Sequence, residues 1–291
     1  MTEVKITVGE SYGKKRSISL YLRLIFHVIA SGVFHSVLMY GGYLWMQLLQ
    51  REDVTEPAIV TAKLFTPCYL TNWNFLFQTI FLTMSLVYDL MEWFDRHETG
   101  LGRKLRFCRD VMFSGLVVPL TLFISTMFWT LFWIDRELVF PVVYDQLVPW
   151  WFNHCVHTNI AIVILIETVL QARRHPTHYK LELWLTGGAG VLYAIVYYSI
   201  FFFAHRWLYA VFGIMTWWQV CLYQILIWTS TFVFYYIQFP INRIFHREEV
   251  EDQKQVIQEQ KSGIQNGGFT EQTNDSVLKH RSKNQIESSS F

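Results

Sequence analysis

The sequence is poor in charged residues. Asp, Glu, Lys and Arg make up 16% of its 291 residues, whereas 52% are hydrophobic and 18% are aromatic. An average soluble domain carries roughly 25% charged residues. Too few charged side chains are therefore present to cover a water-facing surface, and the composition favours a membrane protein.

Other shortages exclude further classes. The net charge is only +1, so nothing indicates nucleic-acid binding. None of the four cysteines forms a Cys-x-x-Cys pair, which argues against a zinc site or a disulfide scaffold. We expect no metal and no cofactor. The first nineteen residues are polar, so we expect no cleavable signal peptide, and the first apolar segment should target the chain.

Six apolar windows are long enough to cross a bilayer, which takes about 20 residues of helix. Helices are expected because a lipid-exposed backbone must satisfy its own hydrogen bonds, and the alternating pattern of barrel strands is absent. The prediction is an all-α, polytopic membrane protein with a six-helix bundle. The windows are Leu24–Leu48, Tyr69–Leu90, Val111–Ile134, Phe152–Leu170, Leu183–Phe203 and Trp217–Ile237.

The flanks of these windows differ from them in composition. We expect residues 1–23 to form a cytosolic arm and residues 24–239 to form the transmembrane domain. Residues 240–291 are rich in Glu, Gln, Lys, Ser and Asn, and such a segment buries too little apolar surface to offset its chain entropy. We expect it to be a cytosolic, largely disordered tail.

The distribution of Lys and Arg predicts the orientation. Of the 24 such residues, 20 lie in the amino-terminal arm, the second and fourth loops and the tail, and four lie in the other three loops. Because cytosolic loops are enriched in Lys and Arg, both termini should be cytosolic. Loops one, three and five then face the lumen or the exterior, in the endoplasmic reticulum or the plasma membrane.

A polar cluster opens the fourth window. Residues 149–171 read PWWFNHCVHTNIAIVILIETVLQ, in which Asn153, His154 and His157 precede a long aliphatic run. Asn153 and His157 are four residues apart and share one helical face. An ionisable side chain inside a bilayer is costly and is a candidate for function. The predicted orientation places this cluster near the lumenal interface.

A second polar stripe lies at the same predicted depth. Thr71, Asn74 and Gln78 share one face of the second window, which should point into the bundle. A hydroxyl becomes a nucleophile beside a base, and histidine is the usual base, so Thr71 and His157 form a candidate pair. The alternatives are a threonine bonded to its own helix and a histidine that bridges helices.

Four further residues are candidates for support. Asn153 and His154 are placed to hold His157 in one tautomer or to donate to an oxyanion. Asp145, in the third loop, is placed to orient a histidine, or else to join a solvated ion-pair network with Arg136. Gln78 belongs to the polar stripe of the second window. We expect Asp89 and Glu167, near the cytosolic end, to be structural partners of Arg or His.

Two stretches carry a family resemblance. Residues 128–167 keep the pattern FW…DRE…P…D…P-W-x-N-H-x-x-H-T…ILIE, and residues 69–81 read YLTNWNFLFQTIF, with Thr71 and Gln78 at the matching spacing. Both stretches resemble the androgen-induced-gene family of multi-pass membrane proteins. The resemblance covers roughly residues 69–239.

The resemblance implies an activity. Members of this family are threonine hydrolases that cleave fatty acid esters of hydroxy fatty acids. It implies that Thr71 is the nucleophile, that His157 is the essential histidine, and that the substrate is a lipid ester from the bilayer. The Asn72-Trp73 pair is also a pattern of the rolling-stone proteins. The alternative function is therefore non-catalytic, in cell-surface signalling or cell fusion, and protein partners remain unknown.

Overall fold

The computed structural model describes residues 17–52, 54–173 and 176–246, and these residues form helices without any strand. Six helical segments are long and apolar enough to cross a membrane. This confirms the predicted all-α membrane fold. The segments are Ile18–Leu49, Pro57–Trp93, Gly100–Ile134, Trp150–Leu170, Tyr179–Ala204 and Trp217–Phe245.

Several of these segments consist of more than one helix. The first segment is a single helix, α1 (Ile18–Leu49). The second segment contains α2 (Pro57–Phe65), η1 (Thr66–Cys68) and α3 (Leu70–Trp93). The third segment contains α4 (Gly100–Met112), η2 (Phe113–Val117) and α5 (Val118–Ile134). The fourth segment contains α6 (Trp150–His154), η5 (Cys155–Asn159) and α7 (Ile160–Leu170). The fifth segment is α8 (Tyr179–Ala204), and the sixth is α10 (Trp217–Phe245). The connections hold η3 (Arg136–Leu138), η4 (Val142–Gln146) and α9 (Ala210–Gly213).

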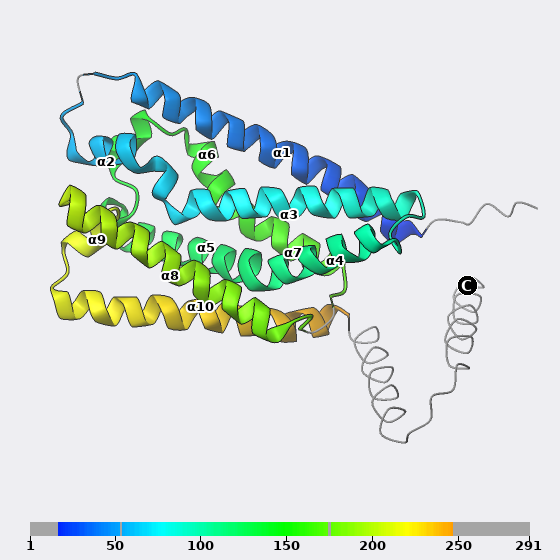
Figure 1. The fold of residues 1–291 in the computed structure, drawn as a ribbon. Helices are drawn as coiled ribbons and strands as arrows, with labels where there is room; N and C mark the ends of the chain where they lie inside the picture. The colour runs from blue at the N-terminus through cyan, green and yellow to red at the C-terminus, as the bar shows by residue number, and fades with distance from the viewer. Residues whose placement is uncertain (1–16, 53, 174–175, 247–291) are drawn as a thin grey trace, which may run out of the picture. The chain divides into compact units, whose positions relative to one another are not determined.

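The bundle has two distinct ends. In Figure 1, α2 and α9 lie at one end, called here the α2 end, and the start of α4 lies at the other, called the α4 end. The outer helices extend past their predicted limits, since α1 begins at Ile18 and α10 continues through Pro240 to Phe245. The predicted tail from residue 247 onward lies outside the described residues, as does most of the amino-terminal arm.

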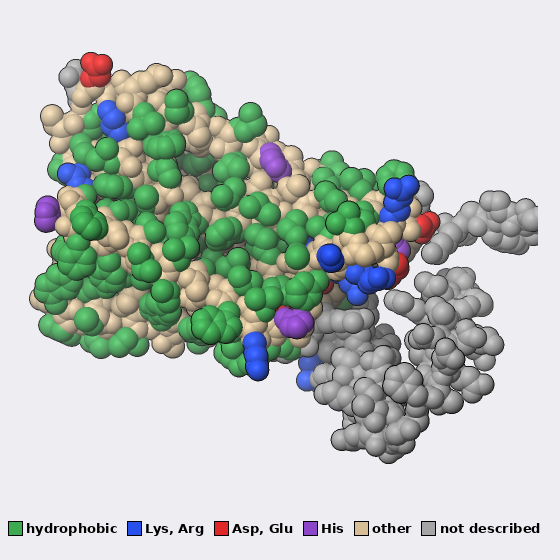
Figure 2. Space-filling model, in the orientation of Figure 1, with side chains coloured by type: hydrophobic (Ala, Val, Ile, Leu, Met, Phe, Trp, Pro, Cys, Tyr) green, Lys and Arg blue, Asp and Glu red, His purple; other side chains and the backbone are tan. Residues whose placement is uncertain are grey.

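The surface of the bundle agrees with a membrane location. On the face shown in Figure 2, hydrophobic side chains cover the middle, and charged side chains are more numerous towards the two ends. The core is also apolar, as in the stacked rings of Phe34 and Phe75, whose centroids are 4.6 Å apart. Aromatic and aliphatic side chains thus face both inward and outward, as expected for a protein in lipid.

The third segment is interrupted where a proline enters it. Pro119 lacks a backbone N–H, and a π-turn, η2, comes directly before α5. The carbonyl of Gly115 accepts a hydrogen bond from Thr186 Oγ1 of α8 at 2.7 Å. The carbonyl of Ser114 accepts one from Gln238 Nε2 of α10 at 2.9 Å. Two neighbouring helices therefore supply the donors that this interrupted helix lacks.

Paired charges join the helices at the α4 end. The His27 ring lies between two carboxylates, with Nδ1 2.6 Å from Asp89 and Nε2 2.7 Å from Glu167. Glu167 also pairs with Arg173. These contacts confirm the expectation that Asp89 and Glu167 have structural partners. The α4-end network consists of Arg23, His27, Asp89, Glu92, Arg109, Asp110, Glu167 and Arg173.

Candidate active site

A central cavity opens inside the half of the bundle nearer the α2 end. Its volume is about 740 Å³, within the roughly 300–1,000 Å³ that is typical of small-molecule sites. All six membrane segments contribute to its lining, and most of the lining side chains are aliphatic or aromatic. The lining also includes Thr71, Asn153 and His157, which therefore share one chamber. The cavity is suited to an apolar ligand with a polar group near its middle.

Thr71 is the second residue of α3 and lines the cavity. Its hydroxyl has no hydrogen-bond partner among the described residues. Thr79 and Thr83, further along the same helix, donate to the carbonyls four residues earlier, each at 2.8 Å. Thr71 thus differs from its neighbours in having a hydroxyl that is not engaged by its own helix. The position at the start of a long helix also favours negative charge on this hydroxyl.

His157 lies in the middle of the π-turn η5, which interrupts the fourth membrane segment. The side chain is 8% exposed, and its Nδ1 has no hydrogen-bond partner. The ring stacks on Phe128 of α5, with centroids 3.5 Å apart and planes 6° apart. This stack holds the plane of the imidazole ring. Single π-turns inside α-helices occur frequently at functional sites, and the sequence analysis did not anticipate this one.

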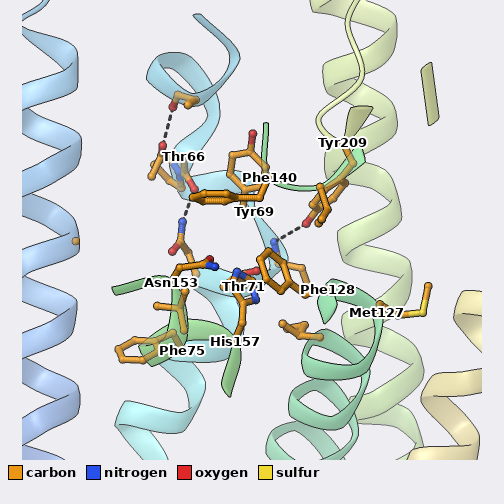
Figure 3. Close-up of a pocket in the computed structure, with 18 of the residues that line it drawn as sticks. Thr66, Tyr69, Thr71, Phe75, Met127, Phe128, Phe140, Asn153, His157 and Tyr209 are labelled. Carbon is orange, nitrogen blue, oxygen red and sulfur yellow. Dashed lines mark hydrogen bonds between the residues drawn. The ribbon is translucent and has the colours of Figure 1, made fainter. Parts of the chain in front are cut away.

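Asn153 completes the polar group. It is 1% exposed, and its Nδ2 has no hydrogen-bond partner. In Figure 3 its side chain lies with those of Thr71 and His157 in the centre of the cavity, with Tyr69 and Phe140 on one side. An amide donor without a partner is costly in so buried a position. Its amide is therefore available to a ligand in the cavity.

The remaining predicted residues lie elsewhere. His154 does not line the cavity: its Nδ1 lies 3.0 Å from Thr158 Oγ1, and its ring packs on Trp150. Asp145 pairs with Arg136 at 2.8 Å, which is the loop ion pair foreseen as the alternative. No carboxylate among the described side chains contacts His157. The structure thus differs from the expectation of a triad oriented by Asp145.

Gln78 lies beneath the site without lining it. Its Nε2 donates to the carbonyl of Ile160, the first residue of α7, at 2.9 Å. This carbonyl follows directly after the π-turn that holds His157. Gln78 therefore ties α3 to α7 and fixes the relative positions of the two segments that carry Thr71 and His157.

Two tyrosines hold the start of α3. The backbone N–H of Leu70 donates to the hydroxyls of Tyr193 and Tyr209 at 3.1 and 3.2 Å, and these hydroxyls lie 2.6 Å apart. Burial raises the pKa of Tyr209 above its ordinary value. The sequence analysis missed both residues, because they lie more than 120 positions from Leu70. They fix the turn that presents Thr71.

The residues after Thr71 leave the cavity open. Asn72 Nδ2 donates to the carbonyl of Thr66 at 2.6 Å, and Trp73 Nε1 donates to the carbonyl of Pro67 at 2.9 Å. Both side chains therefore turn back towards η1. The Asn72-Trp73 pair stabilises the turn before α3 and does not separate Thr71 from His157.

A comparison with protein families gives a match over most of the chain. The model described as FAR-17a/AIG1-like protein matches residues 22–243. This range includes all six membrane segments except residues 18–21 at the start of α1 and residues 244–245 at the end of α10. No solved structure matches the chain.

Curated relatives match part of the chain. The androgen-dependent TFPI-regulating protein of Mesocricetus auratus is 36% identical over 163 residues, which is 53% of this chain and 68% of that protein. The Homo sapiens protein of the same name is 33% identical over 50% of this chain and 62% of its own length. The androgen-induced gene 1 protein of Homo sapiens is 30% identical over 38% of this chain and 48% of its own length.

Proposed function

We propose that this chain, which belongs to the FAR-17a/AIG1-like family of membrane proteins, is a membrane-embedded hydrolase of lipid esters. The observation that carries the proposal is the unengaged hydroxyl of Thr71 in one cavity with the unpartnered nitrogens of His157 and Asn153. A nucleophile, a base and an amide donor are the groups that acyl transfer requires.

The first half of the reaction transfers the acyl group to the protein. His157 takes the proton of Thr71 while Oγ1 attacks the ester carbonyl carbon. The carbonyl oxygen becomes an oxyanion, and Asn153 Nδ2 donates to it. The bond to the alcohol oxygen then breaks, and His157 returns the proton to that oxygen. The products of this half are a hydroxy fatty acid and an acyl-threonine.

The second half restores the protein. Water attacks the acyl carbon with His157 as the base, and the bond to Thr71 Oγ1 breaks. The proton returns to Thr71, and a free fatty acid leaves. Phe128, stacked on His157, holds the plane of the imidazole ring during both halves.

The shape and lining of the cavity favour a substrate with two long apolar arms. Its polar group is central, and its walls come from all six membrane segments. A fatty acid ester of a hydroxy fatty acid has this form, since its ester lies between two chains. The ester sits beside Thr71 while both chains stay among apolar side chains, so the substrate enters from the bilayer.

Labelling of membranes with a fluorophosphonate probe tests the proposal. Wild type should be labelled, whereas Thr71→Ala and His157→Ala should not. Thr79→Ala and His154→Ala are matched controls on the same membrane segments, and both should keep the label. The proposal fails if wild type neither reacts with the probe nor hydrolyses a branched fatty ester, which would leave the non-catalytic, rolling-stone-like function.

We also propose that the α2 end faces the lumen or the exterior and that both termini are cytosolic. The Lys and Arg distribution supports this orientation. A tag placed after Phe291 should be accessible to antibody from the cytosol without permeabilisation of the organelle. Protection of that tag would reverse the proposed orientation.

A further inference from the structure

The residues that line the central cavity differ on the two sides of Thr71. One group lies along α1 and includes Gly41 and Leu48; it is called here the arm along α1. The other group lies on α5, α8 and α10 and includes Thr186 and Tyr193; it is called the arm between α8 and α10. The two residues named in each group are seven positions apart on one helix, so each group of lining residues spans roughly 10 Å. The two groups differ in charge.

The arm along α1 ends at a cation. Among the described residues, Arg51 is the only charged residue that lines the central cavity; it lies two residues after the end of α1, and it is exposed. No carboxylate of the described residues lies within ion-pairing distance of its guanidinium. Gln47 and Gln146 line the same arm. This end therefore offers a positive charge and amide groups to a polar or anionic group.

The arm between α8 and α10 is lined by uncharged side chains. Trp228 and Phe232 of α10 and Gly190 of α8 line it, together with the polar but uncharged Thr186 and Gln224. A Cβ atom at Gly190 would lie 3.6 Å from the Trp228 ring, in ordinary contact, so a longer side chain there would displace this ring or enter the arm. No charged residue lines this arm in the described part of the chain. It is suited to the methyl end of an acyl chain.

We propose that the cavity binds its ligand in one direction, with a carboxylate at Arg51 and an acyl chain between α8 and α10. This rests on the proposed function, because an ester of a hydroxy fatty acid carries one free carboxylate on its alcohol arm. The acyl arm then lies against Trp228, and the ester carbonyl lies at Thr71. Arg51 selects the acid form of the substrate, and Gly190 sets the length of the acyl chain.

Binding to a variant that cannot react separates this proposal from catalysis. Thr71→Ala protein is titrated with the palmitate ester of hydroxystearic acid and with the methyl ester of that compound, with tryptophan fluorescence as the readout. The acid should bind about two- to fivefold more tightly than its methyl ester, as expected for one ion pair at an exposed arginine. When Arg51→Gln is combined with Thr71→Ala, this preference for the acid should disappear. Arg51→Lys in the same background should keep most of it.

Arg206→Gln is the matched control, since Arg206 is at the same end and contacts Thr61 outside the cavity. It should leave the preference unchanged. Equal affinities for the acid and the methyl ester, or a preference that survives Arg51→Gln, would overturn the carboxylate assignment. If the preference is found but wild type hydrolyses neither compound, the proposed function fails and the binding direction stands.

The apolar arm is tested by filling it. Gly190→Leu should weaken binding by about fourfold for each methylene of the acyl chain that no longer fits, and should spare short-chain esters. Gly188→Leu is the control two residues away, because a Cβ at Gly188 meets nothing within 4 Å. Identical chain-length profiles for the two variants would contradict the proposal that the acyl chain occupies this arm.

Discussion

Two polar regions lie on the same pair of helical segments, at opposite ends. Thr71 and Asp89 are both on α3, and His157 and Glu167 are both on the segment that becomes α7. In the α4-end network every charged side chain faces an opposite charge. In the central cavity the hydroxyl of Thr71 and the nitrogens of Asn153 and His157 lack partners. The two regions share these helical segments, but the polar groups of the network are paired and those of the cavity are not.

This contrast distinguishes polar side chains that stabilise the fold from polar side chains that remain available to a ligand. A buried charge without a partner is costly, so the α4-end network pairs its charges across α1, α3, α4 and α7. Several arginine nitrogens there also lack hydrogen bonds, but the Arg173 guanidinium packs on the Phe113 ring, 3.7 Å from its centroid. The cavity leaves small neutral groups unpaired beside open space. Under the proposed function, the substrate is the partner of these groups.

Loss of the nucleophile should give the largest effect. Thr71→Ala should lower kcat for a branched fatty ester by roughly 10³-fold or more, because no other hydroxyl replaces it. Thr71→Ser should retain measurable activity. Purified protein in nanodiscs gives the rate, and the thermal transition confirms folding. A rate of ester hydrolysis by Thr71→Ala close to that of wild type would mean that the cavity has no more of a catalytic role than the network.

Loss of the amide donor should give a smaller kinetic effect. Asn153→Ala should lower kcat by about 10²–10³-fold, the usual consequence of removing one oxyanion donor, with little change in KM. Asn159→Ala, at an exposed position of the π-turn η5 in the same membrane segment, is the control. If Asn153→Ala instead raises KM with kcat unchanged, Asn153 binds the substrate without stabilising the oxyanion.

The network should respond in stability and not in rate. Glu167→Gln leaves His27 and Arg173 without their shared carboxylate, and the unfolding free energy should fall by about 3–5 kcal/mol. Glu92→Gln, at a partly exposed pair with Arg23, should cost about 0–1 kcal/mol. Thermal unfolding measures both variants. A folded Glu167→Gln protein with a kcat below a hundredth of the wild-type value would assign the network a catalytic role.

Much of the fold could be predicted from the sequence, because the length of an apolar run depends on local composition. The confirmed predictions include the six membrane segments and the partners of Asp89 and Glu167. The continuation of α10 beyond Pro240 was missed, since a proline preceded by a full helical turn need not end a membrane helix.

The site was predictable only in part. The similar depth of Thr71 and His157 in the membrane follows from their positions near the start of their apolar windows. Both residues line the cavity in the structure. The π-turn at His157, the Phe128 stack and the tyrosines that hold Leu70 depend on packing between distant segments. No local pattern marks such contacts. The expectation that Asp145 orients a histidine was not met, because Asp145 pairs with Arg136 in the same loop.

The central claim is that Thr71 becomes acylated, and the direct measurement is to locate the covalent adduct. Wild-type protein is treated with the fluorophosphonate probe, digested and analysed by mass spectrometry. The account predicts a single modified peptide, with the phosphonyl group on Thr71 and none in protein that carries His157→Ala. Modification of another hydroxyl, or hydrolysis of the ester by protein that carries no adduct at Thr71, would contradict it.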